Sequence, residues 1–122
     1  MPSVHPNSFL CKHSANLPVI ACCRHLAYQL SVNLLAYDYS GYGESTGEPS
    51  PSGCYSDIQA CWDYLTQERG FKPEEIVLYG QSVGSGPTGH LAARQPKLKG
   101  CVFHSGIVSG KLPVHLHVAS AV

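Results

Sequence analysis

The stretch that decides the fold is EEIVLYGQSVGSGPTGHLAARQP, residues 74–96. It opens with a short apolar run, residues 76–79, which predicts a buried strand. Residues 87–95 begin with a proline and end before another, and this predicts a helix because proline is tolerated at the first helical position. The centre of the chain is therefore a glycine-rich turn between a strand and a helix.

The turn itself reads Gly80-Gln81-Ser82-Val83-Gly84, which fits the pattern Gly-x-Ser-x-Gly. Between a strand and a helix, this pattern indicates a sharp, strained turn that presents the serine as a nucleophile. Side chains two residues before and after would crowd the turn, so glycine suits Gly80 and Gly84. The backbone amide of Val83 would donate to a developing oxyanion. We interpret Ser82 as a nucleophile; the alternative is a glycine-rich turn that contains an incidental serine.

The flanking segments continue the alternation of strand and helix. Residues 32–39 are almost continuously apolar, which predicts a strand buried on both faces. Apolar residues recur at helical spacing in residues 51–70, and Gly70 stands where such a helix would stop. Residues 101–103 predict another strand. The order predicts an α/β fold with three adjacent parallel strands joined by right-handed crossovers.

The two ends of the chain are less regular. Residues 1–25 contain three prolines and show no clear period, which predicts loop, and residues 26–31 predict only the end of a helix. In the tail, apolar and polar residues alternate weakly, and the segment could either pair as a strand or remain unpaired. The chain is thus divided into a poorly defined N-terminal segment (1–31), a central α/β core (32–110) and a divergent tail (111–122).

Composition bounds the classes of function. The formal net charge is +0 with histidine neutral, so no electrostatic argument indicates a nucleic-acid partner. No apolar run reaches about 18 residues, and the start lacks a charged region followed by an apolar one, so neither a membrane span nor a signal peptide is predicted. The six cysteines are irregularly spaced, and we interpret them as reduced thiols of a cytoplasmic protein.

Two other kinds of site are weighed and set aside. Cysteines and histidines near the start could be drawn as a zinc site, but they lack paired C-x2-C spacing. They are Cys11, His13, Cys22, Cys23 and His25. Gly84, Gly86 and Gly89 match the register of a dinucleotide fingerprint, but no Asp or Glu follows Glu75 to bind a ribose. We therefore predict no metal and no cofactor.

Several motifs taken together resemble one family. YDYSGYGEST (residues 37–46), GQSVG (80–84) and VFHSGIVSG (102–110) resemble the α/β-hydrolase domain-containing protein 17 group over about residues 32–110. Members of that group are serine hydrolases that remove palmitoyl groups from protein cysteines at membranes. The resemblance implies a partial α/β-hydrolase fold, with Ser82 as the nucleophile and Val83 as a backbone oxyanion donor. It also implies an S-acylated protein or other acyl ester as substrate, and peripheral association with membranes.

The catalytic acid and histidine are not identifiable in this chain. In this fold they follow the nucleophile along the sequence, yet no Asp or Glu follows Ser82. Asp38, Asp57 and Asp63 precede it, and we interpret them as structural. His104 ends a strand and could approach the serine, although a solvated histidine is the simpler interpretation. None of the downstream histidines is assigned as the base; these are His90, His104, His115 and His117.

The oxyanion loop is also altered. Residues 12–17, KHSANL, are at best a degraded version of the family's His-Gly-Asn loop. We therefore expect the chain to be the central piece of a serine hydrolase, inactive or incomplete by itself. The alternative is a non-catalytic remnant that acts as a binding module.

Overall fold

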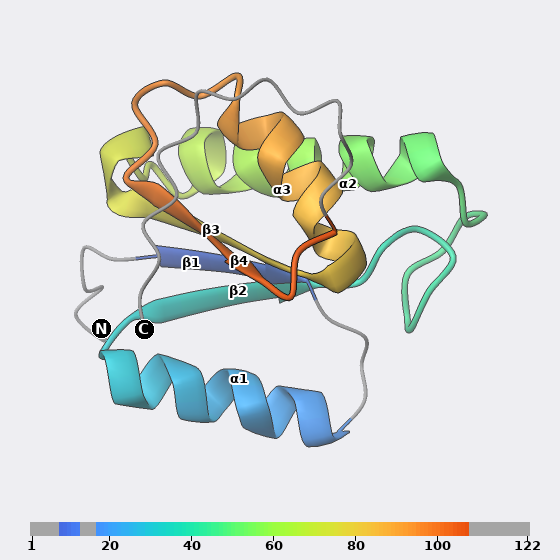
Figure 1. Ribbon diagram of the computed structural model, residues 1–122, viewed down its shortest axis with the longest axis horizontal. Coiled ribbons are helices and arrows are strands. Elements are labelled where there is room, and N and C mark those ends of the chain that lie inside the picture. Colours follow the sequence, from blue (N-terminus) through green and yellow to red (C-terminus); the bar gives the residue numbers. More distant parts are fainter. Residues whose placement is uncertain (1–7, 13–16, 108–122) are drawn as a thin grey trace.

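The computed structural model describes residues 8–12 and 17–107. Four parallel strands form one sheet: β1 (Ser8–Lys12), β2 (Asn33–Tyr37), β3 (Ile76–Gln81) and β4 (Gly100–His104). Helix α1 (Leu17–Leu30) lies on one side of the sheet, and α2 (Pro51–Asp63) and α3 (Ser85–Ala92) lie on the other (Figure 1). This is the predicted α/β class of fold, with the expected parallel strands.

The strand order is β2-β1-β3-β4, which corrects two expectations. The strands predicted from residues 32–39 and 76–79 are not neighbours, because β1 lies between them and pairs with both. The loop predicted for residues 1–25 is wrong where the structure describes it, since β1 and most of α1 fall there. The predicted helix end near Leu30 is confirmed.

Strand β2 is also less buried than expected. A continuous apolar run is typical of a strand covered on both faces, but every position of β2 is exposed or half-buried and none is buried. The reason is its place at the edge of the described sheet, with β1 as its one strand neighbour there. The interior strand is β3, whose Ile76 and Leu78 are fully buried.

Helix α2 begins and ends as local signals predict. The Ser50 side chain accepts a hydrogen bond from the Gly53 amide at 2.9 Å, and Pro51 occupies the first turn. The helix continues into a π-helical turn, Tyr64–Glu68. Gly70 then adopts a φ of 71°, which allows the chain to reverse after the helix.

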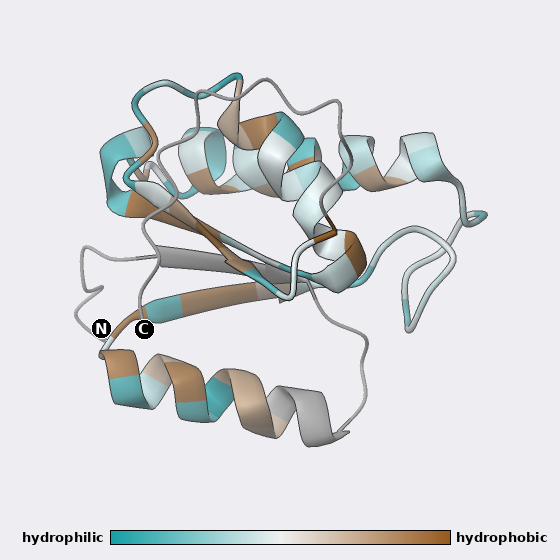
Figure 2. Ribbon diagram, viewed as in Figure 1, coloured by the Kyte–Doolittle hydropathy of each residue, from teal (hydrophilic) through white to brown (hydrophobic). Residues whose placement is uncertain are grey.

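The core lies between β3 and the helices α2 and α3. Its buried residues are Ile58, Trp62, Leu65, Ile76, Leu78 and Leu91. Apolar residues run along β2 and β3, whereas the α2 helix carries more polar residues (Figure 2). Burial of these side chains stabilises the packing of α2 and α3 against β3. The turn between the end of β3 and the start of α3 is held in place by this packing. Within the described residues, no helix is both long and apolar enough to cross a membrane.

The reactivity of the cysteines gives a test of this packing. Cys22, Cys54, Cys61 and Cys101 are free thiols. Burial, with a smaller contribution from the Asp57 charge, raises the pKa of Cys61 from 9.0 to about 11. Because alkylation requires the thiolate, we expect Cys61 to be alkylated about a hundredfold more slowly than an ordinary thiol at neutral pH.

The measurement is the rate of iodoacetamide modification of each cysteine-containing peptide by mass spectrometry, from pH 7 to 11. The Cys61 rate should keep rising toward the upper end of this range, and the exposed Cys22 serves as the internal reference. Equal rates at the two cysteines in the folded chain would contradict the packing of Cys61 against the core.

Candidate active site

The turn after β3 has the geometry that the sequence predicts. Ser82 follows the last residue of the strand and has a φ of 49°, in the left-handed region that non-glycine residues rarely adopt. A 3-10 turn, Ser82–Gly84, leads into α3, and Ser82 is exposed. The side chain therefore stands at the carboxyl edge of the sheet, where ligands bind in open α/β folds.

Gly80 is required by close packing of the turn. A Cβ atom there would lie 2.6 Å from the Thr88 Oγ1 atom and 2.7 Å from the Gly84 carbonyl oxygen. Gly84 itself is buried, with a φ of −64°. The expectation that the turn excludes a side chain thus holds at Gly80, while Gly84 needs no left-handed backbone.

Helix α3 starts earlier than predicted. It begins at Ser85, so Pro87 lies within its first turn rather than at its first position. The first four amides of a helix have no partner inside it, so proline is tolerated throughout this turn. Val83, which follows Ser82, is 58% exposed. Its role as an oxyanion donor stays a prediction.

The loop after β2 is held against α2 by one carboxylate. Asp57 accepts hydrogen bonds from the Ser40 amide at 2.8 Å and from the Ser40 hydroxyl at 2.7 Å. The Ser45 hydroxyl donates to the Asp38 carbonyl at 3.0 Å, closing the loop on itself. Gly43, at a φ of 57°, passes so close to the Asp38 carboxylate that a Cβ atom would overlap it. The glycines and serines of this motif therefore shape a loop at the same edge as Ser82.

Removing the Asp57 carboxylate should loosen this loop. Two hydrogen bonds to a charged, partly buried acceptor are lost in Asp57→Ala, so we expect the free energy of unfolding to fall by about 2 kcal/mol. Urea unfolding followed by the fluorescence of the buried Trp62 measures the change.

Asp63→Ala is a matched control on the same helix. Asp63 accepts one hydrogen bond, at 2.9 Å, from the Gln59 side chain. Its replacement should change the free energy of unfolding by about 0.5 kcal/mol or less. Equal effects of the two substitutions would show that the contact between Asp57 and Ser40 contributes nothing to stability.

Among the described residues, neither His90 nor His104 forms a hydrogen bond to a carboxylate. His104 lies next to Gln81 in the sheet register, and its Nδ1 atom is 2.6 Å from the Tyr79 hydroxyl oxygen. The rings of His90 on α3 and Tyr55 on α2 lie with their centroids 4.6 Å apart and their planes tilted by 59°. Burial, and then the nearby Arg94 charge, lower the pKa of His90, so it stays neutral at pH 7. His115 and His117 lie outside the described residues.

Two of the three aspartates named above are held by hydrogen bonds to other side chains. Asp57 and Asp63 are engaged with Ser40 and Gln59. Asp38 Oδ1 is buried, and no hydrogen-bond partner contacts it among the described residues. None of the three forms a hydrogen bond to a histidine in that part of the chain, and the cysteine and histidine grouping near the start falls partly outside it. The contacts of Asp57 and Asp63 hold parts of the fold together, whereas no contact explains the buried Asp38 Oδ1 atom, and the structural interpretation of the three aspartates stays a prediction.

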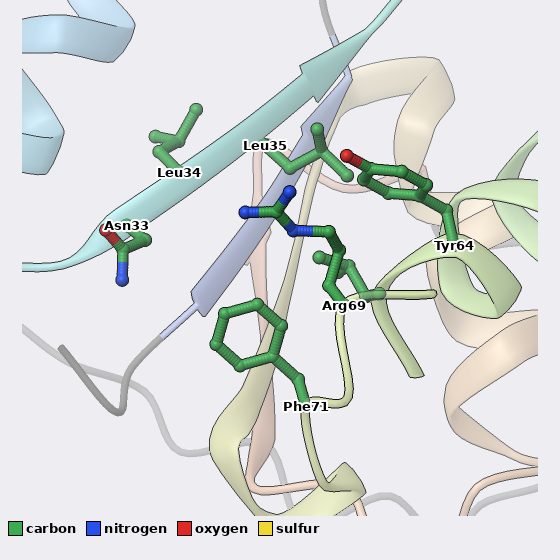
Figure 3. Close-up of a pocket in the computed structure, with 7 residues that line it drawn as sticks. Asn33, Leu34, Leu35, Tyr64, Arg69 and Phe71 are labelled. Carbon is green, nitrogen blue, oxygen red and sulfur yellow. The ribbon is translucent and has the colours of Figure 1, made fainter. Parts of the chain in front are cut away.

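A hollow of about 230 Å³ lies away from the serine. Its lining residues are Asn33, Leu34, Leu35, Tyr64, Leu65, Arg69 and Phe71. They come from the amino end of β2 and from the segment after α2, and Figure 3 shows the Arg69 guanidinium directed toward β2. Because the strands are parallel, this hollow is at the edge of the sheet opposite Ser82, and it plays no part in the candidate site.

Comparison with known proteins identifies the class. Residues 13–120 match the family described as the alpha/beta hydrolase fold, and the chain belongs to that family. The solved structure of a lipase-esterase related protein from Clostridium acetobutylicum ATCC 824 superposes with a TM-score of 0.61 at 28% sequence identity. The superposition covers 83% of this chain and 42% of the lipase-esterase related chain. Membership of this family defines the class of protein to which the chain belongs.

Curated relatives of this chain include members of the alpha/beta hydrolase domain-containing protein 17 group. Human alpha/beta hydrolase domain-containing protein 17C is 45% identical over 85 residues, which cover 70% of this chain. Alpha/beta hydrolase domain-containing protein aho-3 of Caenorhabditis elegans is 47% identical over 85 residues. The matched region spans only 26% and 25% of these two relatives. The resemblance to the protein 17 group is thereby confirmed.

No sequence pattern singles out Ser85. Its hydroxyl donates to the Ser82 carbonyl oxygen at 2.6 Å and accepts from the Ile107 amide at 3.0 Å. A serine one residue beyond the Gly-x-Ser-x-Gly motif carries no local signal of such contacts, because Ile107 is 22 residues away along the chain.

Proposed function

We propose that this chain carries the nucleophile of a serine hydrolase of the palmitoyl-protein thioesterase type. The observation that carries the proposal is the left-handed φ of 49° at Ser82, at the end of β3 and between Gly80 and a helix. A non-glycine residue in this conformation costs about 1–3 kcal/mol, and such strain is concentrated at functional sites. The substrate class rests on the combination of the DYSGYG loop with the GQSVG turn.

The reaction is acyl transfer in two steps. The Ser82 Oγ atom attacks the thioester carbonyl and loses its proton to a general base. The carbon–sulfur bond then breaks, an acyl ester forms on Ser82, and the cysteine sulfur leaves with a proton. Water, activated by the same base, hydrolyses the ester, and the fatty acid is released. The Val83 amide is the donor that we assign to the oxyanion of both tetrahedral intermediates.

The base of this reaction is not assigned to any residue. His104 is engaged with Tyr79, the ring of His90 contacts that of Tyr55, and no carboxylate follows Ser82 in the 122-residue sequence. A serine hydroxyl without a base is a poor nucleophile. The 122-residue chain alone is therefore proposed to be inactive or incomplete. Its proposed substrate is an S-acylated protein or another acyl ester, met at a membrane surface to which the protein is peripherally bound.

A non-catalytic role is the second candidate. It is favoured by the same lack of an acid after Ser82, because a remnant could keep the fold and bind a partner without turnover. Hydrolysis of a palmitoyl-cysteine peptide, followed as free thiol, distinguishes the two. Turnover by a hydrolase completed with an acid and a histidine, and its loss in Ser82→Ala, would support the thioesterase. No turnover in the completed enzyme would favour the binding role.

A further inference from the structure

The Ser85 hydroxyl joins two segments that the sequence keeps apart. Ser85 is 5% exposed and begins α3, three residues after the nucleophile. Both its amide and its hydroxyl donate to the carbonyl oxygen of Ser82, the hydroxyl at 2.6 Å. The same hydroxyl accepts from the Ile107 amide at 3.0 Å. One buried oxygen thus contacts the nucleophile turn and the segment that leaves β4.

Both of the joined turns are strained. Ser105, directly after β4, has a φ of 49°, as Ser82 has. Left-handed backbone at a non-glycine residue persists only where surrounding contacts hold it. Gly106 packs against Ser85, since a Cβ atom there would lie 3.5 Å from the Ser85 Cβ atom. The hydroxyl and this close contact together fix the path of the chain from β4 over the start of α3.

We propose that Ser85 is a positioning residue, whose hydroxyl holds the exit turn of β4 against the nucleophile turn. The inference rests on the proposed function of Ser82 and deepens it. The hydrogen bond from the Ile107 amide to the Ser85 hydroxyl holds Ile107 beside the turn that would carry the acyl group. Because the Ile107 side chain is 59% exposed, it offers an apolar surface there. Ser85 itself touches no reacting atom: it acts through the Ser82 carbonyl and the Ile107 amide.

The test is native-state hydrogen exchange by NMR on the full chain. Ser85→Ala removes the acceptor of the Ile107 amide, and loss of one hydrogen bond should speed exchange at that amide about tenfold. The carbonyl resonance of Ser82 should move in the same variant. Ser85→Thr keeps a hydroxyl and should retain both the slow exchange and the resonance position.

Two controls make the result specific. Ser45→Ala removes another hydrogen bond from serine to backbone, the 3.0 Å contact with the Asp38 carbonyl, and should leave Ile107 unchanged. The Leu98 amide, bonded to the Gln95 carbonyl at 3.0 Å, should exchange at the same rate in every variant that remains folded. Faster exchange at Leu98 as well would indicate general loosening and would overturn a local role for Ser85.

The inference is overturned if Ile107 exchanges within about twofold of the unmodified chain in Ser85→Ala. It is also overturned if Ser85→Thr behaves like Ser85→Ala, because the hydroxyl would then not be the cause. Failure of the proposed function has a different signature. A completed hydrolase that never acylates Ser82 would remove that function and leave the exchange result unaffected.

Discussion

Ser82 in the 122-residue chain is expected not to react with a fluorophosphonate probe. Loss of triad members lowers the rate by about three orders of magnitude or more, even when the remaining site still binds substrate. Here no acid follows Ser82, and the nearest histidine across the sheet, His104, bonds to Tyr79 instead. The strained turn leaves Ser82 exposed, and in the described residues the hydrogen bond of His104 goes to Tyr79.

Completing the site should restore reactivity. Fusion of the C-terminal third of a related hydrolase, with a His-Gly-Asn loop in place of residues 12–17, supplies an acid, a histidine and an oxyanion donor. We expect labelling to become measurable in this chimaera and to vanish in its Ser82→Ala variant. Gel fluorescence after equal exposure of both chains to the probe compares the rates.

Strong labelling of the chain as it stands would contradict this expectation. Labelling that depended on Ser82 would mean that a base is already present. His104→Ala is then the first substitution to make, since the sheet register places His104 beside Gln81. Tyr79→Phe would follow, because it removes the hydroxyl that contacts the His104 ring.

The largest effect on stability is expected for Gly80→Ala. The added Cβ atom would meet the Thr88 side chain at 2.6 Å and the Gly84 carbonyl oxygen at 2.7 Å. A side chain can rotate away, but the carbonyl belongs to the backbone of the turn and can move only if the turn opens. We expect the free energy of unfolding to fall by about 3 kcal/mol, a large part of the stability of a small domain.

Gly100→Ala is the matched control, since Gly100 also lies in a strand of the same sheet. A Cβ atom there meets no atom within 4 Å, so the substitution should be close to neutral. Chemical unfolding of the three chains, followed by Trp62 fluorescence, gives the comparison. An equal and small effect at both glycines would mean that the turn at Ser82 relaxes without cost, and that its geometry is not strained.

Local signals determined the elements around Ser82. The apolar run from Ile76 to Leu78 specifies a buried strand, and Gly80 and Ser82 specify the turn after it. These features depend on residues close by in the sequence, so a short stretch is enough to predict them. Gly70 likewise marks the end of the helical segment by its backbone conformation alone. The family could be recognised for the same reason, since its motifs are short and contiguous.

Tertiary structure decided the strand order and the contacts that hold the site. β1 is a short strand whose place between β2 and β3 depends on pairing with segments far along the chain. The hydrophobic pattern within such a short stretch does not show which strands it will pair with. The bonds of Asp57 to Ser40 and of Ser85 to Ile107 join residues 17 and 22 positions apart. Ser85 and Ile107 meet because the parallel pairing of β3 with β4 brings the carboxyl ends of these two strands to one edge of the sheet, whereas Asp57 and Ser40 join helix α2 to the loop after β2.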